Sequence, residues 1–310
     1  MQRFFTEPCL GIEITSRALR LGVLSRKNGD TGLVASTIID VPLGMVNEGF
    51  ASQPFGDLEG LAELLRSGMR QIFPRQMRKA GLSLPDGLFR IQVLEFDDLP
   101  SGGRDRERLI RWRLEKGSSF DTVNTRLRFQ VHARPDRGFS VLACLAKQDI
   151  IAGYEDLFTA LGLETWTVAP SSLHALNFYA PAIGAKDGAG YAMTWIAEGS
   201  YATIIMERGG PRFYRYKEFR SGTPEETTAR LLREIDDSLH FYTHRDRTQA
   251  ADVGRLYVAG EPTLVAPLVE DIRQAAPLTV EPLDPGKVTG TAGNCSPVLA
   301  AAFGAGGVLC

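Results

Sequence analysis

The sequence predicts two related α/β domains, and three observations lead to this prediction. Residues 10–17 read as a strand that enters a tight turn and leaves as another strand, and residues 193–200 repeat that pattern. Residues 256–262 read as a strand that feeds a helix. Each half of the chain therefore opens with strand–turn–strand and ends with helices, as expected of two domains built in the same way.

Length and composition agree with this prediction and exclude several classes of protein. A chain of 310 residues with 44% hydrophobic content can bury a sizeable core. Its net charge of −2 gives no electrostatic argument for nucleic acid or an anionic membrane as a partner. The four cysteines lack metal-site or disulfide-rich spacing, which predicts reduced thiols in the cytoplasm. No signal sequence or apolar run of about 18 residues occurs, so we expect no membrane span.

In the first half, alternating apolar residues predict a hairpin over residues 10–24 and a third strand over residues 34–41. Asp57 is the expected N-cap of a helix, because apolar residues recur at helical spacing over residues 58–72. Residues 82–99 are rich in strand-forming residues. The remaining expected elements are a charged helix over 103–116, strands near 126–133 and 139–146, a helix over 148–160, a strand over 164–168 and a short helix over 170–179.

The second half follows a small, polar, glycine-rich junction at residues 185–190. Its clearest element is a helix that begins with a capping box: Thr223 as N-cap, Pro224 at the first position and Glu226 three residues after the cap. Gly209 and its neighbour predict a hairpin turn. The other expected elements are strands near 192–196, 202–207, 213–219 and 254–258, and helices over 262–275 and 296–303.

The two strand–turn–strand segments resemble the hairpins with which actin-like ATPases hold phosphates from opposite sides. In that family the first turn carries an acid for a magnesium-bound water and a glycine that lets backbone amides approach an anion. Here Glu13 keeps the acid, but Thr15 stands at the glycine position and adds a branched side chain. In the second turn Trp195 stands at the aspartate position and Ala197 at the glycine position. Tryptophan neither accepts a hydrogen bond from water nor ligates a cation.

These departures predict a degenerate nucleotide site without catalytic residues. The third segment keeps a glycine, but a glutamate and a proline replace the small residues that usually admit adenine. The candidate nucleotide-binding residues are Glu13, Thr15, Ser16, Gly199, Ser200, Gly260 and Glu261. We expect no cofactor; weak binding of ATP with magnesium through the hydroxyls of these turns stays open as the alternative.

Other residue clusters do not predict a catalytic or metal site. His240 and His244 are four residues apart on one predicted helix, but the sequence offers no evident third ligand, so we expect no metal. Ser171 and Ser172, close to His174, resemble a helix cap more than a nucleophile with its base.

The basic helix over residues 104–116 is the candidate surface for binding a partner. Arg108 and Arg111 would supply charge, and Trp112 would supply contact area. The alternative is an ordinary amphipathic helix that buries its apolar residues and extends its arginines into solvent.

The order of segments over nearly the whole chain resembles the PilM family, the cytoplasmic actin-like component of type IV pilus assembly platforms. Residues 11–16 match the Gly-Ile-Asp-Ile-Gly-Ser opening of that family imperfectly, and residues 109–116 resemble its Ile-Lys-Trp-Glu helix. Residues 143–147, 238–242 and 258–260 also fall where similar segments are expected. Each piece is individually short, and the likeness rests on their order.

This resemblance implies a two-domain actin-like and FtsA-like fold, which is a ribonuclease H-like α/β architecture. Domain 1 is expected over residues 1–185 and domain 2 over residues 186–310. Domain 1 would contain an inserted small α+β subdomain of the SHS2-like type at about residues 84–168.

The resemblance also implies a function and partners. We expect a non-catalytic scaffold that binds the short cytoplasmic N-terminal segment of a PilN-like bitopic membrane protein, in a groove beside the inserted subdomain. It would contact the pilus motor ATPases and associate with the inner membrane through its partners. Three alternatives stay open: an active actin-like ATPase, a filament-forming FtsA-like protein, and the cytoplasmic GspL-like component of type II secretion.

Overall fold

The computed structural model forms two compact units, one of Met1–Leu88, Gln148–Gly184 and Asp284–Cys310, the other of Phe89–Lys147 and Ala185–Leu283. The residues that the structure describes are 8–27, 30–50, 53–72, 77–117, 122–134, 137–184, 190–219, 222–245, 253–275, 278–290 and 296–307. Most of the junction expected at residues 185–190 lies outside them, and the expected domain bounds stay a prediction.

The first unit is built on a five-stranded mixed sheet with the strand order β3-β2-β1-β4-β8. Strand β1 pairs antiparallel with β2 and parallel with β4, so the hairpin predicted over residues 10–24 is confirmed. The strands are β1 (Cys9–Ile14), β2 (Ala18–Lys27), β3 (Asp30–Asp40), β4 (Lys79–Leu84) and β8 (Glu164–Pro170).

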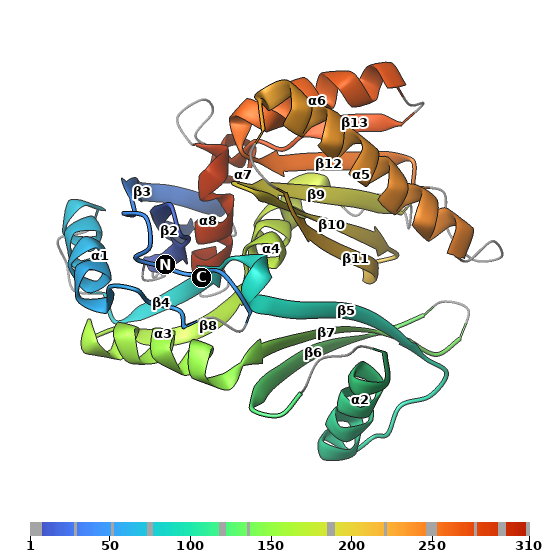
Figure 1. The fold of residues 1–310 in the computed structure, drawn as a ribbon, viewed down its shortest axis with the longest axis horizontal. Coiled ribbons are helices and arrows are strands. Elements are labelled where there is room, and N and C mark those ends of the chain that lie inside the picture. The colour runs from blue at the N-terminus through green and yellow to red at the C-terminus, as the bar shows by residue number, and fades with distance from the viewer. Residues whose placement is uncertain are drawn as a thin grey trace, which may run out of the picture. The chain divides into compact units, whose positions relative to one another are not determined.

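Helices cover both faces of this sheet (Figure 1). Helix α1 (Leu58–Ile72) begins at the predicted cap, where Asp57 Oδ1 accepts a hydrogen bond from the amide of Gly60 (2.9 Å). On the opposite face, α8 (Ala300–Gly307) consists of small residues and Phe303, so its backbone lies directly against β1 and β4. The unit also contains α3 (Gln148–Ala160), α4 (Ser171–Ile183), α7 (Pro285–Thr289) and the short 3-10 helices η1 (Asp86–Leu88) and η2 (Pro297–Leu299). Sequence analysis missed α7.

The second unit contains a sheet with the same connectivity, in the order β11-β10-β9-β12-β13. Strands β9, β10 and β11 form an antiparallel meander, and β12 lies parallel between β9 and β13. This repeat confirms that the two halves are built alike. The strands are β9 (Tyr191–Ala197), β10 (Ser200–Glu207), β11 (Gly210–Glu218), β12 (Arg255–Gly260) and β13 (Thr279–Pro282), the last of which sequence analysis missed.

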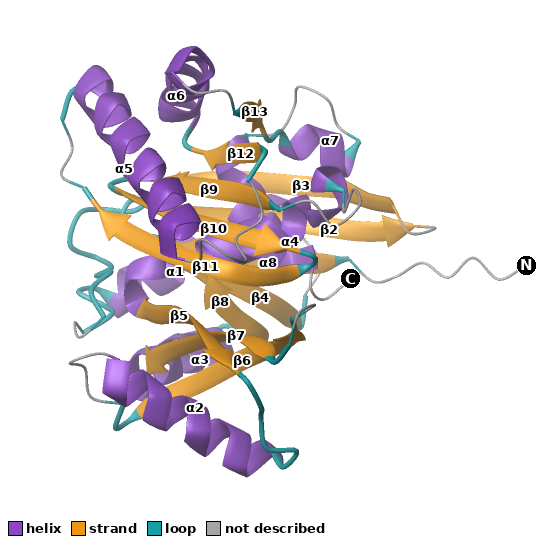
Figure 2. Ribbon diagram, turned by 90° about the vertical axis from the view of Figure 1, so that its right-hand side faces the viewer, coloured by secondary structure: helices purple, strands orange, loops and turns teal. Residues whose placement is uncertain are grey.

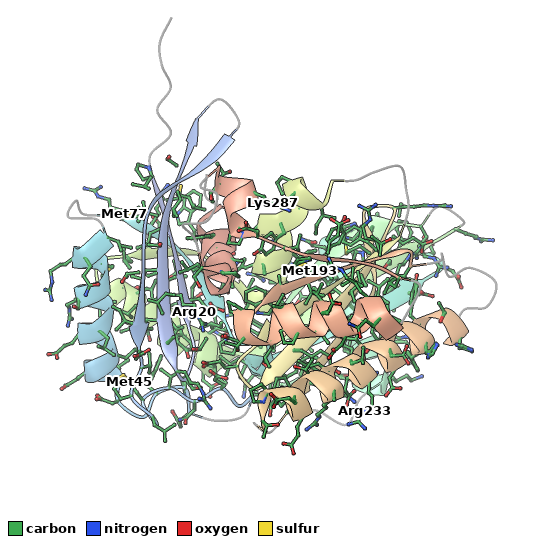
Figure 3. The ribbon with its side chains drawn as sticks, turned by 90° about the horizontal axis from the view of Figure 1, so that it is seen from above. Arg20, Met45, Met77, Met193, Arg233 and Lys287 are labelled. Carbon is green, nitrogen blue, oxygen red and sulfur yellow. The ribbon has the colours of Figure 1, made fainter. Side chains whose placement is uncertain are left out.

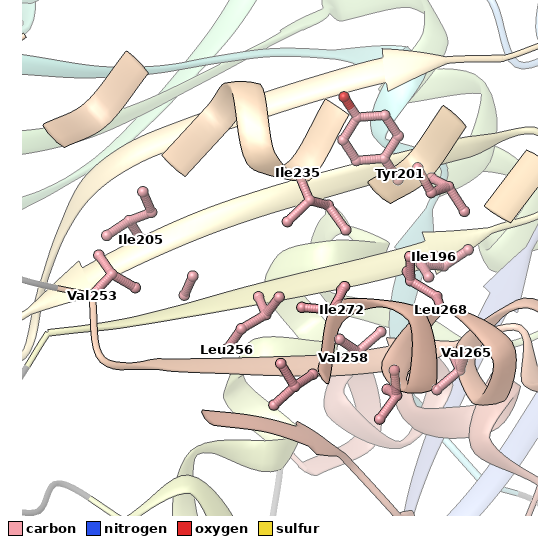
Figure 4. Close-up of a cluster of buried hydrophobic side chains, with 14 of the residues drawn as sticks. Ile196, Tyr201, Ile205, Ile235, Val253, Leu256, Val258, Val265, Leu268 and Ile272 are labelled. Carbon is pink, nitrogen blue, oxygen red and sulfur yellow. The ribbon is translucent and has the colours of Figure 1, made fainter. Parts of the chain in front are cut away.

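Two helices, α5 (Pro224–Arg245) and α6 (Pro262–Ala275), contribute to the core of this sheet. The predicted capping box is confirmed: the Thr223 amide donates to Glu226 Oε2 (3.1 Å), and the Glu226 amide donates to Thr223 Oγ1 (3.3 Å). Figure 4 shows apolar side chains of both helices meeting those of the strands. The buried cluster includes Ile196, Tyr201, Ile205, Leu231, Ile235, Leu256, Val258, Leu268 and Ile272.

A second, smaller sheet completes the unit, with strands β5 (Phe89–Phe96), β7 (Phe139–Lys147) and β6 (Thr125–Ala133) in that order (Figure 2). Helix α2 (Gly103–Gly117) packs on it by burying Ile110 and Leu114 against Leu127, Val141 and Leu145. The strand-rich segment at residues 82–99 therefore divides between two sheets, β4 in one and β5 in the other. Among the described helices, none is long and apolar enough to cross a membrane.

Candidate functional site

The acid of the first turn is held inside the first unit by its own neighbours. Glu13 is 1% exposed at the end of β1. Its Oε2 accepts a hydrogen bond from the Arg20 guanidinium of β2 (3.1 Å), and its Oε1 accepts one from Ser171 Oγ of α4 (2.6 Å). Figure 3 labels Arg20 on its strand. Both carboxylate oxygens are therefore bonded within the protein.

Burial and charge act in opposite directions on this carboxyl. Loss of solvent raises the pKa of Glu13, while the Arg20 guanidinium and the Ser171 hydroxyl oppose that shift. An acid that holds a cation-bound water in a nucleotide site needs an oxygen that faces the ligand. Glu13 instead serves a buried ion pair, whose partner Arg20 is itself 8% exposed.

The backbone amides of the first turn are also satisfied internally. Thr15 N–H donates to Ala18 O (3.0 Å), and the amides of Arg17 and Ala18 donate to the Thr15 hydroxyl (3.3 and 2.9 Å). The amide of Ser16 donates to the Glu48 carboxylate. The threonine at the expected glycine position thus closes the turn on itself, and a carboxylate occupies the place where amides would meet an anion.

In the second turn, tryptophan fills the position where the family has an aspartate. Trp195 is 3% exposed on β9, and its indole Nε1 has no hydrogen-bond partner within the described part of the chain. Gly199 adopts a positive φ of 76°, as a tight β9–β10 hairpin requires, and its carbonyl accepts from the Phe219 amide (2.8 Å). The partly buried Ser200 begins β10. This turn connects β9 to β10, and β9 contains no acidic residue that could hold a cation-bound water.

The glycine of the third segment is required by packing within the second unit. Gly260 has a φ of 116°, and a Cβ on it would lie 1.9 Å from Ile196 O of β9. The Glu261 amide donates to that same carbonyl (2.9 Å). The Glu261 carboxylate accepts a hydrogen bond from the Thr263 hydroxyl (3.0 Å) at the start of α6. Glu261 therefore acts as a helix cap.

The candidate nucleotide residues are thus shared between the units. Glu13, Thr15 and Ser16 lie in the first, whereas Gly199, Ser200, Gly260 and Glu261 lie in the second. Within the second unit, the pairing of β9 with β12 brings Gly260 beside Ile196, close to the second turn. Their role stays a prediction, and the internal bonds of each turn favour a structural one.

The three candidate partner-binding residues of α2 differ in exposure and in how firmly their side chains are held by neighbours. Arg111 is tied down by Glu107 (3.1 Å) and by the Thr125 carbonyl (3.2 Å). The Arg108 side chain is 80% exposed with a loose ion pair to Asp105 (3.4 Å). Trp112 is 48% exposed, with the Lys116 ammonium 4.3 Å from its ring centroid. Arg108 and Trp112 form an accessible surface, called the α2 face below.

Two serines predicted to cap a helix have another role. The N-cap of α4 is Pro170, without a side-chain hydrogen bond, so that prediction is wrong. Ser171 donates to Glu13, and the Ser172 hydroxyl donates to the Asp86 carboxylate. They begin the helix as buried donors for two acids that are distant in sequence, and no local pattern signals such a pairing.

His174, in the next turn of α4, should make stability depend on pH. It is 1% exposed, and burial lowers its pKa to about 3. The unfolded chain therefore binds the extra proton between about pH 6.5 and pH 3, so this contribution to stability is complete above pH 6.5 and decreases as the pH falls. We expect a loss of about 2 kcal/mol between pH 7.5 and pH 5.0 from this residue.

Urea denaturation of the parent and of His174→Gln at both pH values measures this contribution. The raised pKa of Glu13 acts in the opposite direction, because the folded state then binds more protons, but it is common to both proteins. The difference between the two pH dependences isolates the histidine. Equal pH dependences would show that His174 becomes protonated without unfolding.

Comparison with solved structures identifies the architecture. The chain is similar to a structure described as a PilM-PilN type IV pilus biogenesis complex, with 17% identity, a TM-score of 0.79, and 96% of this chain and 97% of that chain covered. A Bacteroides thetaiotaomicron protein with an actin-like ATPase fold and unknown function covers 90% of this chain and 91% of its own, with 8% identity and a TM-score of 0.50. The chain has the actin-like fold.

A third similar structure is the cytoplasmic domain of EpsL, an inner membrane component of the type II secretion system of Vibrio cholerae. It is 11% identical with a TM-score of 0.55, and 96% of this chain and 94% of that chain are covered. No protein-family model matches the sequence, and sequence comparison with curated proteins finds no significant match. The predicted two-domain actin-like fold and the structural likeness to PilM are confirmed.

Proposed function

We propose that this protein is a scaffold of an inner-membrane assembly platform, of the kind that builds type IV pili. The observation that carries this proposal is the likeness to the PilM-PilN complex, which extends over nearly all of both chains at a TM-score of 0.79. The other two structures reported above reach TM-scores of 0.50 and 0.55. The EpsL domain supports a type II secretion platform as the second candidate, because that component shares the architecture.

The scaffold acts without hydrolysing ATP. This part of the proposal is supported by the first turn, whose amides bind Thr15, Ala18 and Glu48, and by Trp195 in the second turn. A phosphate would have to displace these bonds before it could bind. The candidate nucleotide residues are therefore assigned a structural role, and no cofactor is required.

Its partner is a PilN-like bitopic protein, whose short cytoplasmic segment binds beside the small three-stranded subdomain. The α2 face supports this assignment, since Arg108 and Trp112 offer charge and exposed aromatic area. Motor ATPases of the same platform are further partners, and these contacts hold the protein at the cytoplasmic side of the inner membrane.

Binding of the cytoplasmic segment tests the proposal directly. The probe is a labelled synthetic peptide with the cytoplasmic N-terminal residues of the proposed PilN-like protein, and fluorescence anisotropy measures its affinity. We expect a dissociation constant in the micromolar range and a loss of at least about tenfold for Trp112→Ala, which corresponds to about 1.4 kcal/mol. A scrambled peptide serves as the sequence control.

Trp166→Ala is the matched control variant. Trp166 lies on β8 in the first unit and resembles Trp112 in two respects: it is 52% exposed, and the Lys79 ammonium lies 3.8 Å from its ring centroid. We expect its affinity to stay within about twofold of the parent. Equal losses for both variants, or no binding of the peptide, would contradict the assigned partner surface.

Calorimetry with magnesium ATP separates the scaffold from an active ATPase of the same fold. We expect no binding tighter than about 1 mM, which is about −4 kcal/mol. Affinity tighter than about 10 μM together with phosphate release would overturn the non-catalytic part of the proposal. The assignment of the partner would survive that result, because it rests on the peptide measurement.

A further inference from the structure

A groove in the second unit lies outside the α2 face and outside the three turns. It has a volume of about 550 Å³ and is bounded by two strands, β5 and β11, and by two helices, α2 and α5. Residues 91–94 form one wall, residues 212–214 another, and Arg113, Lys116 and Phe241 lie around them. We call this feature the β5–β11 groove.

Both strands of the groove are edge strands. β5 is the outer strand of the three-stranded sheet, and β11 is the outer strand of the five-stranded sheet (Figure 1). Over the described residues, β5 forms its ladder with β7 alone, and no backbone hydrogen bond joins it to β11. Residues 91–94 of this strand line the groove, and an unpaired strand edge is the surface to which an extended peptide adds.

The charge of the groove is positive. Arg113 and Lys116 are exposed on its α2 side, and none of the described residues that line the groove is acidic. In the described part of the chain, Arg113 forms neither an ion pair nor a hydrogen bond. The third cation, Arg212, is compensated by Glu207 (3.1 Å), and both side chains are about one-tenth exposed. Among the described residues, Arg113 and Lys116 have no acidic partner, and Lys116 lies over the Trp112 ring. Two cations without an acidic partner favour an acidic ligand.

The groove also has an apolar anchor point. Phe241 of α5 is 54% exposed, although its ring centroid is only 6.0 Å from that of Phe213, which is 8% exposed. An exposed aromatic ring beside a buried one, at the side of a groove, is the surface that a single apolar side chain of a partner covers.

We propose that the β5–β11 groove binds an extended, acidic peptide segment of a partner protein, aligned along β5 and anchored by one apolar side chain against Phe241. The acidic residues would face Arg113 and Lys116. Arg108 and Trp112 of the α2 face do not line the groove, and the two surfaces adjoin at Lys116, whose ammonium lies 4.3 Å from the Trp112 ring centroid. The proposal goes beyond the proposed function and does not depend on it.

Fluorescence anisotropy with two designed probes tests the ligand class. The first probe is a labelled ten-residue peptide that alternates glutamate with leucine and carries one phenylalanine; the second has lysine in place of each glutamate. With the full chain we expect the acidic probe to bind at least about tenfold more tightly, and to weaken as salt increases from 50 to 500 mM. Equal binding of both probes, or no binding of the acidic probe at 1 mM, would overturn the proposal.

Paired variants separate the groove from general electrostatic attraction. Arg113→Glu with Lys116→Glu changes the net charge by −4, and Arg66→Glu with Arg70→Glu makes the same change on helix α1 of the first unit, outside the groove. We expect a loss of at least about tenfold for the first pair and within about twofold for the second. Similar losses for both pairs would attribute binding to net charge alone and contradict a site in the groove.

Hydrogen exchange locates the bound peptide. Addition of the acidic probe should slow exchange of the amides of β5, while those of β4, in the sheet of the first unit, keep their rates. Phe241→Ala should weaken binding of the probe at least about tenfold, because it removes the proposed apolar anchor. We expect this variant to fold, since the Phe241 side chain is 54% exposed. Unchanged exchange in β5 at saturating probe would exclude the groove as the binding site.

Discussion

Replacing Arg20 by methionine is expected to destabilise the protein by about 3–5 kcal/mol, because it leaves the carboxylate of Glu13 buried without a counter-charge. Glu13 is 1% exposed, and the guanidinium of Arg20 lies 3.1 Å from its Oε2. The hydrogen bond from Ser171 stays, but one hydroxyl does not replace a full positive charge. Chemical denaturation followed by circular dichroism measures the loss.

The double variant Glu13→Leu with Arg20→Met is the decisive comparison. Replacing a buried ion pair by apolar side chains of similar volume is often nearly neutral, so we expect most of the lost stability to return. Ser171 keeps the Leu84 carbonyl as an acceptor at 3.1 Å, so its hydroxyl is not left without a partner. A double variant as unstable as Arg20→Met would show that the unpaired carboxylate is not the cause.

Replacing Gly11 by alanine is expected to cost about 3 kcal/mol, although the change adds a single methyl group. A Cβ at Gly11 of β1 would lie 1.7 Å from Ala302 O and 2.5 Å from Gly306 N of α8. Both neighbours are backbone atoms of a helix that lies directly on the sheet, so the helix must move as a whole. The loss should appear in the thermal midpoint and in the urea midpoint alike.

Gly103→Ala is the matched control for this prediction. Gly103 begins α2, and no heavy atom lies within 4 Å of the position of its Cβ. Alanine is the better helix former, so we expect the control to be neutral or more stable by a few tenths of a kcal/mol. An equal loss in both variants would show that contact with α8 is not the cause, and a neutral Gly11→Ala would show that α8 shifts at no cost.

Sequence patterns predicted those elements whose stabilising contacts join residues close together in the chain. The capping box of Thr223 and Glu226 and the cap at Asp57 were predicted because their hydrogen bonds join residues three positions apart. The helix expected over residues 262–275 has the bounds of α6. The short β13 was missed, because four residues are too few for a period to be recognised.

Contacts across long sequence separations were beyond these rules. The segment at residues 82–99 reads as one strand-rich run, yet β4 and β5 pair with partners in different sheets. Arg113 was not among the candidate residues, since its place in the groove depends on β5 and β11. The sequence predicted that α2 has a basic surface, and tertiary packing decided which arginines are free.

The two turns that depart from a nucleotide site show what the sequence determines and what only the tertiary structure determines. By itself, the sequence determined that threonine, tryptophan and alanine replace the residues of a nucleotide site, because residue type alone removes an acid and adds side-chain bulk. Only the tertiary structure decided what occupies those turns: Arg20 and Ser171 hold Glu13, and Glu48 accepts the Ser16 amide from 32 residues away. Hydrogen bonds between distant residues exist only once the sheet and its helices have packed, so no local pattern encodes them.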